Sequence, residues 1–210
     1  MPPALPLVYL DEHMLLVSKP AGLLAVPGRG ADKQDCLSTR LQAQVPGALV
    51  VHRLDMATSG LMLMARSAAV QRALSLAFEQ GRIHKLYEAV VHGHLSADGE
   101  SHEIDLPVGA DWPRRPRQQV DHTHGKPSRT RWRWLAHEGP HSRVQLEPLT
   151  GRTHQLRVHM QAMGHAIVGD ALYAADGGDS APRLLLHARE LSLVHPVSAQ
   201  ALCFSDPTPF

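Results

Sequence analysis

The sequence predicts a mixed α+β fold in which a largely antiparallel sheet is accompanied by a few helices. Short aliphatic runs bounded by turn residues indicate strands, and several follow one another without an intervening helix. Helical spacing occurs in three stretches. Aromatic residues make up 4% of the 210 residues, so aliphatic side chains must fill the core.

The expected elements can be placed along the chain from these patterns. Strands are expected at 7–10, 14–18, 49–51, 61–65, 86–91, 144–146, 184–187, 191–194 and 201–204, and helices at 38–45, 67–80 and 153–163. The second helix is the best defined, because Ser67 suits an N-cap and Gly81 a C-terminal stop. Its apolar stripe, formed by Val70, Leu74, Ala77 and Phe78, should face the core.

Composition bounds the class of protein. The length fits one large domain or two small ones sharing a core, and we expect a single domain over 1–210. No apolar run approaches the roughly 20 residues that span a bilayer, and no basic leader precedes an apolar stretch. Cys36 and Cys203 are expected to be buried free thiols. We therefore expect a cytoplasmic protein that does not associate with membranes.

Charge is unevenly distributed along the chain. The segment 114–157 holds ten Lys and Arg residues against three acidic ones, a net charge of +7. Since the whole chain carries +1, the remainder carries −6. Two interpretations stay open: one face that binds a polyanion, or solvated strand faces that happen to be rich in arginine.

The segment 52–60 (HRLDMATSG) places Arg53 and Asp55 two residues apart, on one face of an extended chain. The turn residues that follow, beginning with Thr58, can hold a carboxylate with backbone NH groups. An ionised and oriented Asp55 can act as a nucleophile. The alternative is an Asx turn in which the carboxylate only stabilises the bend, and the segment by itself favours that alternative.

The segment 149–160 (LTGRTHQLRVHM) places Gly151 before a helix whose first turns carry two arginines. Free NH groups at a helix N-terminus suit a phosphate, and arginine adds planar recognition of it. Arginine this early in a helix opposes the helix dipole, so the pattern is unfavourable without an anion. The segment therefore favours a functional role over a merely solvated helix end.

Two further features allow both a functional and a structural interpretation. Tyr87 lies in an expected strand, where it could stack on a base but more often packs in a core. The loop 111–118 (DWPRRPRQ) combines proline, arginine and one tryptophan, which suits looped RNA or an ordinary basic surface loop.

The fifteen histidines do not form a pattern typical of a metal site. Paired cysteines and a helical His-Glu-x-x-His motif are both missing from the sequence, so zinc is disfavoured. A glycine-rich nucleotide loop is missing as well, which disfavours ATP and NAD. We expect neither metal nor cofactor.

Several of these segments, in order, resemble the RluA-type pseudouridine synthases. The segment 52–60 resembles the family's active-site signature, and 151–157 with His165, Gly169 and Asp170 resembles its later motif. Residues 15–22 resemble its lysine-proline-glycine motif, and Tyr87 its strand tyrosine. The resemblance extends from about Leu7 to Phe204. It points to the short subgroup, which has no N-terminal S4-like RNA-binding domain.

The resemblance implies a fold and a reaction. The fold would be a curved, mostly antiparallel mixed sheet in two halves with a few flanking helices and a catalytic cleft between the halves. The reaction would convert uridine in RNA to pseudouridine without a metal or organic cofactor. The short subgroup implies two substrates, uridine 32 of tRNA anticodon stem-loops and uridine 746 in a 23S rRNA hairpin. We expect a monomer.

The resemblance also implies roles for individual residues. Asp55 would be the nucleophile, Arg157 would pair with its carboxylate and keep it charged, and Tyr87 would stack on the base. Leu156 would form the floor of the base pocket, and Arg53 would fill the space left by the flipped uridine. The residues expected to contact RNA are Arg53, Thr58, Arg114, Arg117, Arg152, His154 and Gln155.

Two other classes of function compete with this one. A non-catalytic RNA-binding module would use the same basic face, and a metal-dependent hydrolase would use the histidines. An acidic residue among arginines favours the isomerase, because a pure RNA binder gains nothing from that negative charge.

Overall fold

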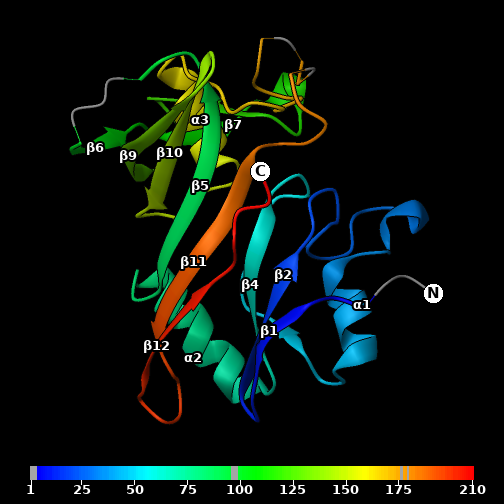
Figure 1. Ribbon diagram of the computed structural model, residues 1–210. Coiled ribbons are helices and arrows are strands. Elements are labelled where there is room, and N and C mark those ends of the chain that lie inside the picture. The colour runs from blue at the N-terminus through cyan, green and yellow to red at the C-terminus, as the bar shows by residue number, and fades with distance from the viewer. Residues whose placement is uncertain (1–3, 96–98, 176, 179) are drawn as a thin grey trace. The chain divides into compact units, whose positions relative to one another are not determined.

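The computed structural model describes residues 4–95, 99–175, 177–178 and 180–210 (Figure 1). The chain divides into two compact units. Unit 1 comprises the chain up to Lys85 together with Ala188–Pro209, and unit 2 comprises Leu86–His187 with Phe210. The described residues contain three α-helices and strands that are mostly paired antiparallel, which confirms the predicted fold class.

Unit 1 contains six strands, two α-helices and the start of β5 within the described part of the chain. The strands are β1 (Leu7–Leu10), β2 (Met14–Lys19), β3 (Leu49–Val50), β4 (Ser59–Ala65), β11 (Leu186–Val194, which begins in unit 2) and β12 (Ala201–Ser205), and the helices are α1 (Leu37–Gln44) and α2 (Ala68–Glu79). Antiparallel pairs join β1 to β2, β2 to β4, β3 to β4 and β11 to β12.

Strands β2 and β4 form the centre of unit 1 because both of their faces are buried. Side chains alternate between the faces of a strand, so Leu15 and Met62 point to one side and Leu16 and Leu63 to the other. The first set packs with Leu37 and Leu41 of α1, and the second with Val70 and Leu74 of α2. This explains why residues 59–65 form an uninterrupted apolar strand rather than an alternating one.

Unit 2 is built on a second set of antiparallel strands. Its elements are β5 (His84–His92, which begins in unit 1), β6 (Ser101–Asp105), β7 (Val108–Ala110), β8 (Gln118–Val120), β9 (Arg129–Glu138), β10 (His141–Pro148), α3 (Gln155–Ala162) and a short 3-10 turn, η2 (Trp112–Arg114). β10 pairs with β5 and β9, and β9 pairs with β6. β7 and β8 form a separate hairpin, and Val158 of α3 packs against Val108 of β7.

Most expected elements are confirmed, and the differences have local causes. Ser67 caps α2 as predicted, its Oγ accepting from the Val70 amide at 3.3 Å. The helix expected from residue 153 begins at Gln155, because His154 adopts a left-handed conformation with φ 55°. The two strands expected at 184–187 and 191–194 are one continuous strand, β11. Both cysteines are free, but only Cys36 is buried; the prediction of a buried Cys203 was wrong.

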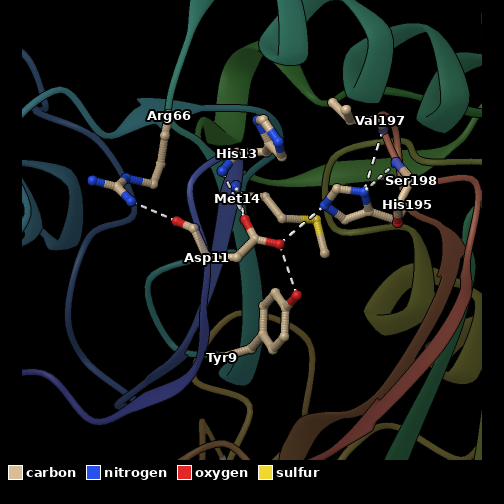
Figure 2. Close-up of polar contacts among 8 residues, drawn as sticks. All are labelled: Tyr9, Asp11, His13, Met14, Arg66, His195, Val197 and Ser198. Carbon is tan, nitrogen blue, oxygen red and sulfur yellow. Dashed lines mark hydrogen bonds and ion pairs between the residues drawn. The ribbon is translucent and has the colours of Figure 1, made fainter.

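A polar cluster fixes the turn between β1 and β2, where the sequence predicted a turn (Figure 2). The Asp11 carboxylate accepts a hydrogen bond from the Met14 amide at 2.8 Å and from the Tyr9 hydroxyl at 2.7 Å. His195, in the turn after β11, lies 3.0 Å from the same carboxylate through Nε2. Its Nδ1 accepts from the Ser198 amide at 2.9 Å, so Nε2 carries the proton that is donated to Asp11.

Candidate active site

Asp55 lies in unit 1, in a tight turn between β3 and β4. Its backbone carbonyl accepts a hydrogen bond from the Thr58 amide at 3.1 Å, which closes the turn. Leu54 before it and Thr58 after it are buried at 4% and 3% exposure, whereas the Asp55 side chain is half-buried. The turn therefore anchors the backbone on both sides of Asp55 and leaves its carboxylate at the boundary with solvent.

A buried lysine also holds this turn in place. Lys19, at the end of β2, is fully buried, and its ammonium donates to the carbonyls of Pro20 (2.9 Å), Leu23 (2.7 Å) and Met56 (3.0 Å). The Gly22 amide also donates to the Met56 carbonyl at 2.9 Å. The lysine-proline-glycine segment is thus tied to the residue that directly follows Asp55.

The strand after the turn requires glycine at one position. Gly60 has φ +110°, and a Cβ atom there would lie 2.3 Å from the carbonyl oxygen of Ala188 in β11. No side chain fits at that distance, so β4 approaches β11 more closely than any other residue would permit.

Arg53 and Thr58, both in segment 52–60, differ in their exposure to solvent. Arg53 is exposed and available to a ligand. Thr58 is 3% exposed, and its contact with RNA stays a prediction.

A second cluster, in unit 2, is centred on Arg157 of α3. Arg157 and Asp170 are 4% and 1% exposed and form a forked ion pair, Nε to Oδ2 and Nη2 to Oδ1, both at 2.7 Å. The same carboxylate accepts from the amides of Leu172 (2.9 Å) and Tyr173 (3.2 Å). Asp170 therefore fixes both the plane of the guanidinium and the turn that carries Tyr173. The predicted pairing of Arg157 with Asp55 stays a prediction.

Tyr173 is the residue of this cluster that sequence reasoning missed. Its ring lies beside two guanidinium groups, with Arg157 at 4.9 Å and Arg117 at 5.3 Å from the ring centre. Its hydroxyl accepts from the Gln118 amide at 2.7 Å and bonds to His154 Nδ1 at 2.7 Å. One buried phenol thus connects the β7–β8 hairpin to the start of α3.

Gln155 has a structural role that the sequence did not reveal. It is 3% exposed, and its side-chain oxygen accepts from the Thr150 hydroxyl (2.7 Å) and the Arg152 amide (3.0 Å). Its nitrogen donates to the Arg129 carbonyl and the Thr130 hydroxyl at 2.9 and 3.0 Å. The amide makes four hydrogen bonds inside unit 2, and the contact of Gln155 with RNA stays a prediction.

The remaining candidate residues vary in exposure. Tyr87 is half-buried in β5, where it pairs with Leu146 of β10, and Leu156 is 7% exposed. Arg152 is exposed, and its Nε donates to the Pro127 carbonyl at 3.2 Å. Arg114 is exposed but ion-paired with the buried Asp111 at 2.6 Å.

Acidic partners offset much of the positive charge in segment 114–157. On β9, Arg131 lies directly opposite Glu103 of β6 and Glu147 of β10, at 3.7 and 3.5 Å, and Arg129 pairs with Glu103 at 2.6 Å. Arg143 of β10 forms ion pairs with Glu88 and Glu138. Arg129 and Arg131 of β9 therefore fit the solvated-strand interpretation. The cations that can meet a polyanion are Arg133 of β9, which donates to the Gln145 side-chain oxygen at 3.3 Å, and those near the β7–β8 hairpin and the start of α3.

Two negative findings concern the part of the chain that the structure describes. No three or more His, Cys, Asp or Glu side chains there are grouped so as to hold a metal ion. No helix there is both long and apolar enough to cross a membrane.

Taken together, these features define an α+β protein with an anchored, partly exposed aspartate in one unit and a buried arginine-carboxylate fork in the other. The chain matches the RNA pseudouridylate synthase family over residues 13–162. That match covers most of the chain, so the chain belongs to this family of RNA-modifying enzymes.

Curated relatives agree with the family match. A protein of Vibrio vulnificus named dual-specificity RNA pseudouridine synthase RluA is 49% identical over 207 residues, covering 94% of this chain and 82% of the relative. A protein of the same name from Escherichia coli K12 is 45% identical over 211 residues, covering 99% and 95%.

Solved structures support the same assignment. Human RNA pseudouridylate synthase domain containing 1 has a TM-score of 0.81 at 32% identity, covering 98% of this chain and 84% of that one. Human RNA pseudouridylate synthase domain containing 4, at 20% identity and a TM-score of 0.76, shares the fold.

Proposed function

We propose that this chain converts uridine 32 in tRNA anticodon loops and uridine 746 in a 23S rRNA hairpin to pseudouridine. The observation that carries the proposal is the anchored turn of Asp55, in a chain that matches the family from residue 13 to 162. The double substrate is supported by the relatives from Vibrio vulnificus and Escherichia coli, whose names state dual specificity and which the chain covers over most of their length.

In the proposed reaction, Asp55 acts as the nucleophile. A carboxylate oxygen bonds to C1′ of the ribose while the N1–C1′ bond breaks, and the bonding electrons leave with the uracil. The uracil then rotates in place, and its C5 bonds to C1′ as the bond to Asp55 breaks. C5 loses its proton and N1 gains one, so the product is an isomer of the substrate and Asp55 is regenerated. Attack of Asp55 at C6 of the base is the alternative first step.

Three other residues complete the proposed chemistry. Arg157 pairs with the Asp55 carboxylate and keeps it charged; its fork with Asp170 supports this role by fixing the guanidinium plane. Tyr87 stacks on the uracil and takes part in removal of the C5 proton. Leu156 supplies an apolar floor that keeps the detached uracil from escaping. The reaction needs neither metal nor organic cofactor.

Binding requires that the target uridine leave its stack, at a cost of a few kcal/mol, which is lower in a loop than in a duplex. Arg53 is exposed and would occupy the space that the uridine leaves. Arg117, Arg152 and His154 would contact the phosphates, and affinity should therefore fall steeply with salt. We assign Arg114 to the internal ion pair with Asp111 instead.

The test separates the enzyme from a binding-only module. Tritium release from C5-labelled tRNA should fall by more than about 1,000-fold in Asp55→Asn, while RNA affinity stays within a few fold. Asp35→Asn is the matched control, because Asp35 is an exposed carboxylate paired with Arg40 in the same unit. Equal turnover in Asp55→Asn and wild type would rule out Asp55 as the nucleophile. Loss of turnover after prolonged EDTA treatment would favour a metal-dependent reaction.

A further inference from the structure

Trp112 is the most exposed of the large apolar side chains in the described residues, at 67%. It begins η2, in the connection between β7 and β8. The Arg115 guanidinium lies over its ring, 4.7 Å from the centre, in the geometry of a cation–π contact. The tip of the β7–β8 hairpin therefore presents a flat aromatic surface next to a cation.

The hairpin tip is held in place by internal contacts. The Asp111 amide donates to the Arg117 carbonyl at 3.0 Å, and the Arg117 amide donates to the Arg114 carbonyl at 3.0 Å. Arg114 also pairs with the Asp111 carboxylate, whose side chain is 5% exposed. At the base of the hairpin, the Gln118 amide donates to the buried Tyr173 hydroxyl. An ordered surface loses less conformational entropy on binding than a mobile loop does.

The chemistry of this tip selects one class of ligand. An exposed indole stacks on the face of any nucleobase, and an arginine beside it contacts both the base plane and the phosphate backbone. Segment 111–117 contains three arginines and one aspartate, and this net positive charge favours a polyanionic ligand over a protein surface with few acidic residues. A base can reach such a surface only if it is unpaired and unstacked, as in a loop.

We propose that Trp112 and Arg115 form a stacking site for an unpaired loop base of the substrate RNA, distinct from the uridine that is modified. This inference rests on the proposed function for the identity of the RNA. It adds a base-stacking contact to the RNA contacts predicted for the neighbouring Arg114 and Arg117.

The experiment measures binding of a labelled tRNA anticodon stem-loop by anisotropy at fixed salt. Trp112→Ala should weaken binding about 5- to 100-fold, the range for loss of one base–aromatic stack, whereas Trp112→Phe should weaken it less. Arg115→Ala should also weaken binding. Val197→Ala, which truncates another apolar side chain at 58% exposure, and Arg72→Ala, which removes one exposed cation from α2, are the matched controls.

A second readout reports the stacking itself. Quenching of tryptophan fluorescence by the RNA should be strong in wild type and much weaker in Trp112→Phe, since of the other two tryptophans Trp132 is 7% exposed and Trp134 is half-buried. In a series of stem-loops, each lacking the base at one loop position, one RNA should lack the base that stacks on Trp112. Wild type and Trp112→Ala should bind that RNA with the same weakened affinity.

The outcomes separate the two proposals. Tritium release by wild type together with Trp112→Ala binding within twofold of wild type would overturn the stacking site and leave the proposed function intact. Equal losses in Trp112→Ala and in both controls would overturn it too. A wild-type protein that neither binds the stem-loop nor releases tritium would refute both.

Discussion

Replacing Asp170 with Asn should destabilise the protein more than any other single change of comparable size in unit 2. The substitution preserves shape and removes one charge from a pair in which both partners are at most 4% exposed. Arg157 would then keep its charge and lose both ionic hydrogen bonds to Asp170. Breaking a buried ion pair from one side costs about 3–5 kcal/mol, because the remaining charge loses compensation in the interior.

Two variants of Asp170 separate the cost of losing its charge from the cost of losing its hydrogen bonds to backbone amides. Asn keeps an oxygen that can accept from the Leu172 and Tyr173 amides, whereas Asp170→Ala loses both hydrogen bonds, at about 1 kcal/mol each. Asp170→Ala should therefore be about 2 kcal/mol less stable than Asp170→Asn. Removing both charges, in Arg157→Met with Asp170→Asn, should restore part of the loss.

Thermal unfolding followed by circular dichroism measures these differences. For a chain of this length, 3–5 kcal/mol corresponds to a decrease in Tm of about 10 °C. Asp111→Asn is the control: its partner Arg114 is 64% exposed, so the cost should be about 1 kcal/mol or less. A decrease in Tm of less than about 3 °C for Asp170→Asn, or strict additivity in the double variant, would refute the reasoning.

Three further predictions concern unit 1. Burial raises the pKa of Asp11, but hydrogen bonds from Met14 and Tyr9 outweigh it and lower the pKa to about 2. The ionised carboxylate therefore contributes about 2 kcal/mol of folding stability above pH 4, which is lost as pH falls toward 2. In urea unfolding, Asp11→Asn should be less stable than wild type at pH 6 but not at pH 2. Burial, with the Lys85 charge nearby, lowers the pKa of His52 to about 3. The free energy of unfolding of the wild type should therefore fall as pH drops from about 6.5 toward 3. In His52→Gln its dependence on pH should be weaker over this range, and an unchanged dependence would contradict this. Gly60→Ala should lower Tm by about 5 °C or more, since its Cβ would overlap the Ala188 carbonyl, and a matched Gly47→Ala, with open space around it, should lower Tm less.

The sequence allowed prediction of those features that depend on neighbours along the chain. The α2 cap at Ser67, the turn at Asp55 and the apolar run of β4 all follow from spacing and turn chemistry within a few residues. Strand ends were less accurate, because pairing with a neighbour extended β10 to His141–Pro148 beyond its apolar centre.

Features that depend on distant residues could not be predicted in this way. Asp170 meets Arg157 across thirteen positions, and Tyr173 meets the Gln118 amide across fifty-five. Thr58 and Gln155, which the resemblance placed in contact with RNA, are each only 3% exposed. A polar residue that satisfies buried backbone groups cannot be distinguished from a surface residue by its type alone.

The paired arginines of β9 affect how ionic strength acts on RNA binding. Arg129 and Arg131 are already balanced by Glu103 and Glu147 across neighbouring strands, so a phosphate would have to displace a carboxylate to reach them. Few counterions are released at such positions. A plot of log affinity against log salt should therefore be much shallower than the arginine content of this region suggests, and its slope counts only the cations that are not held by carboxylates.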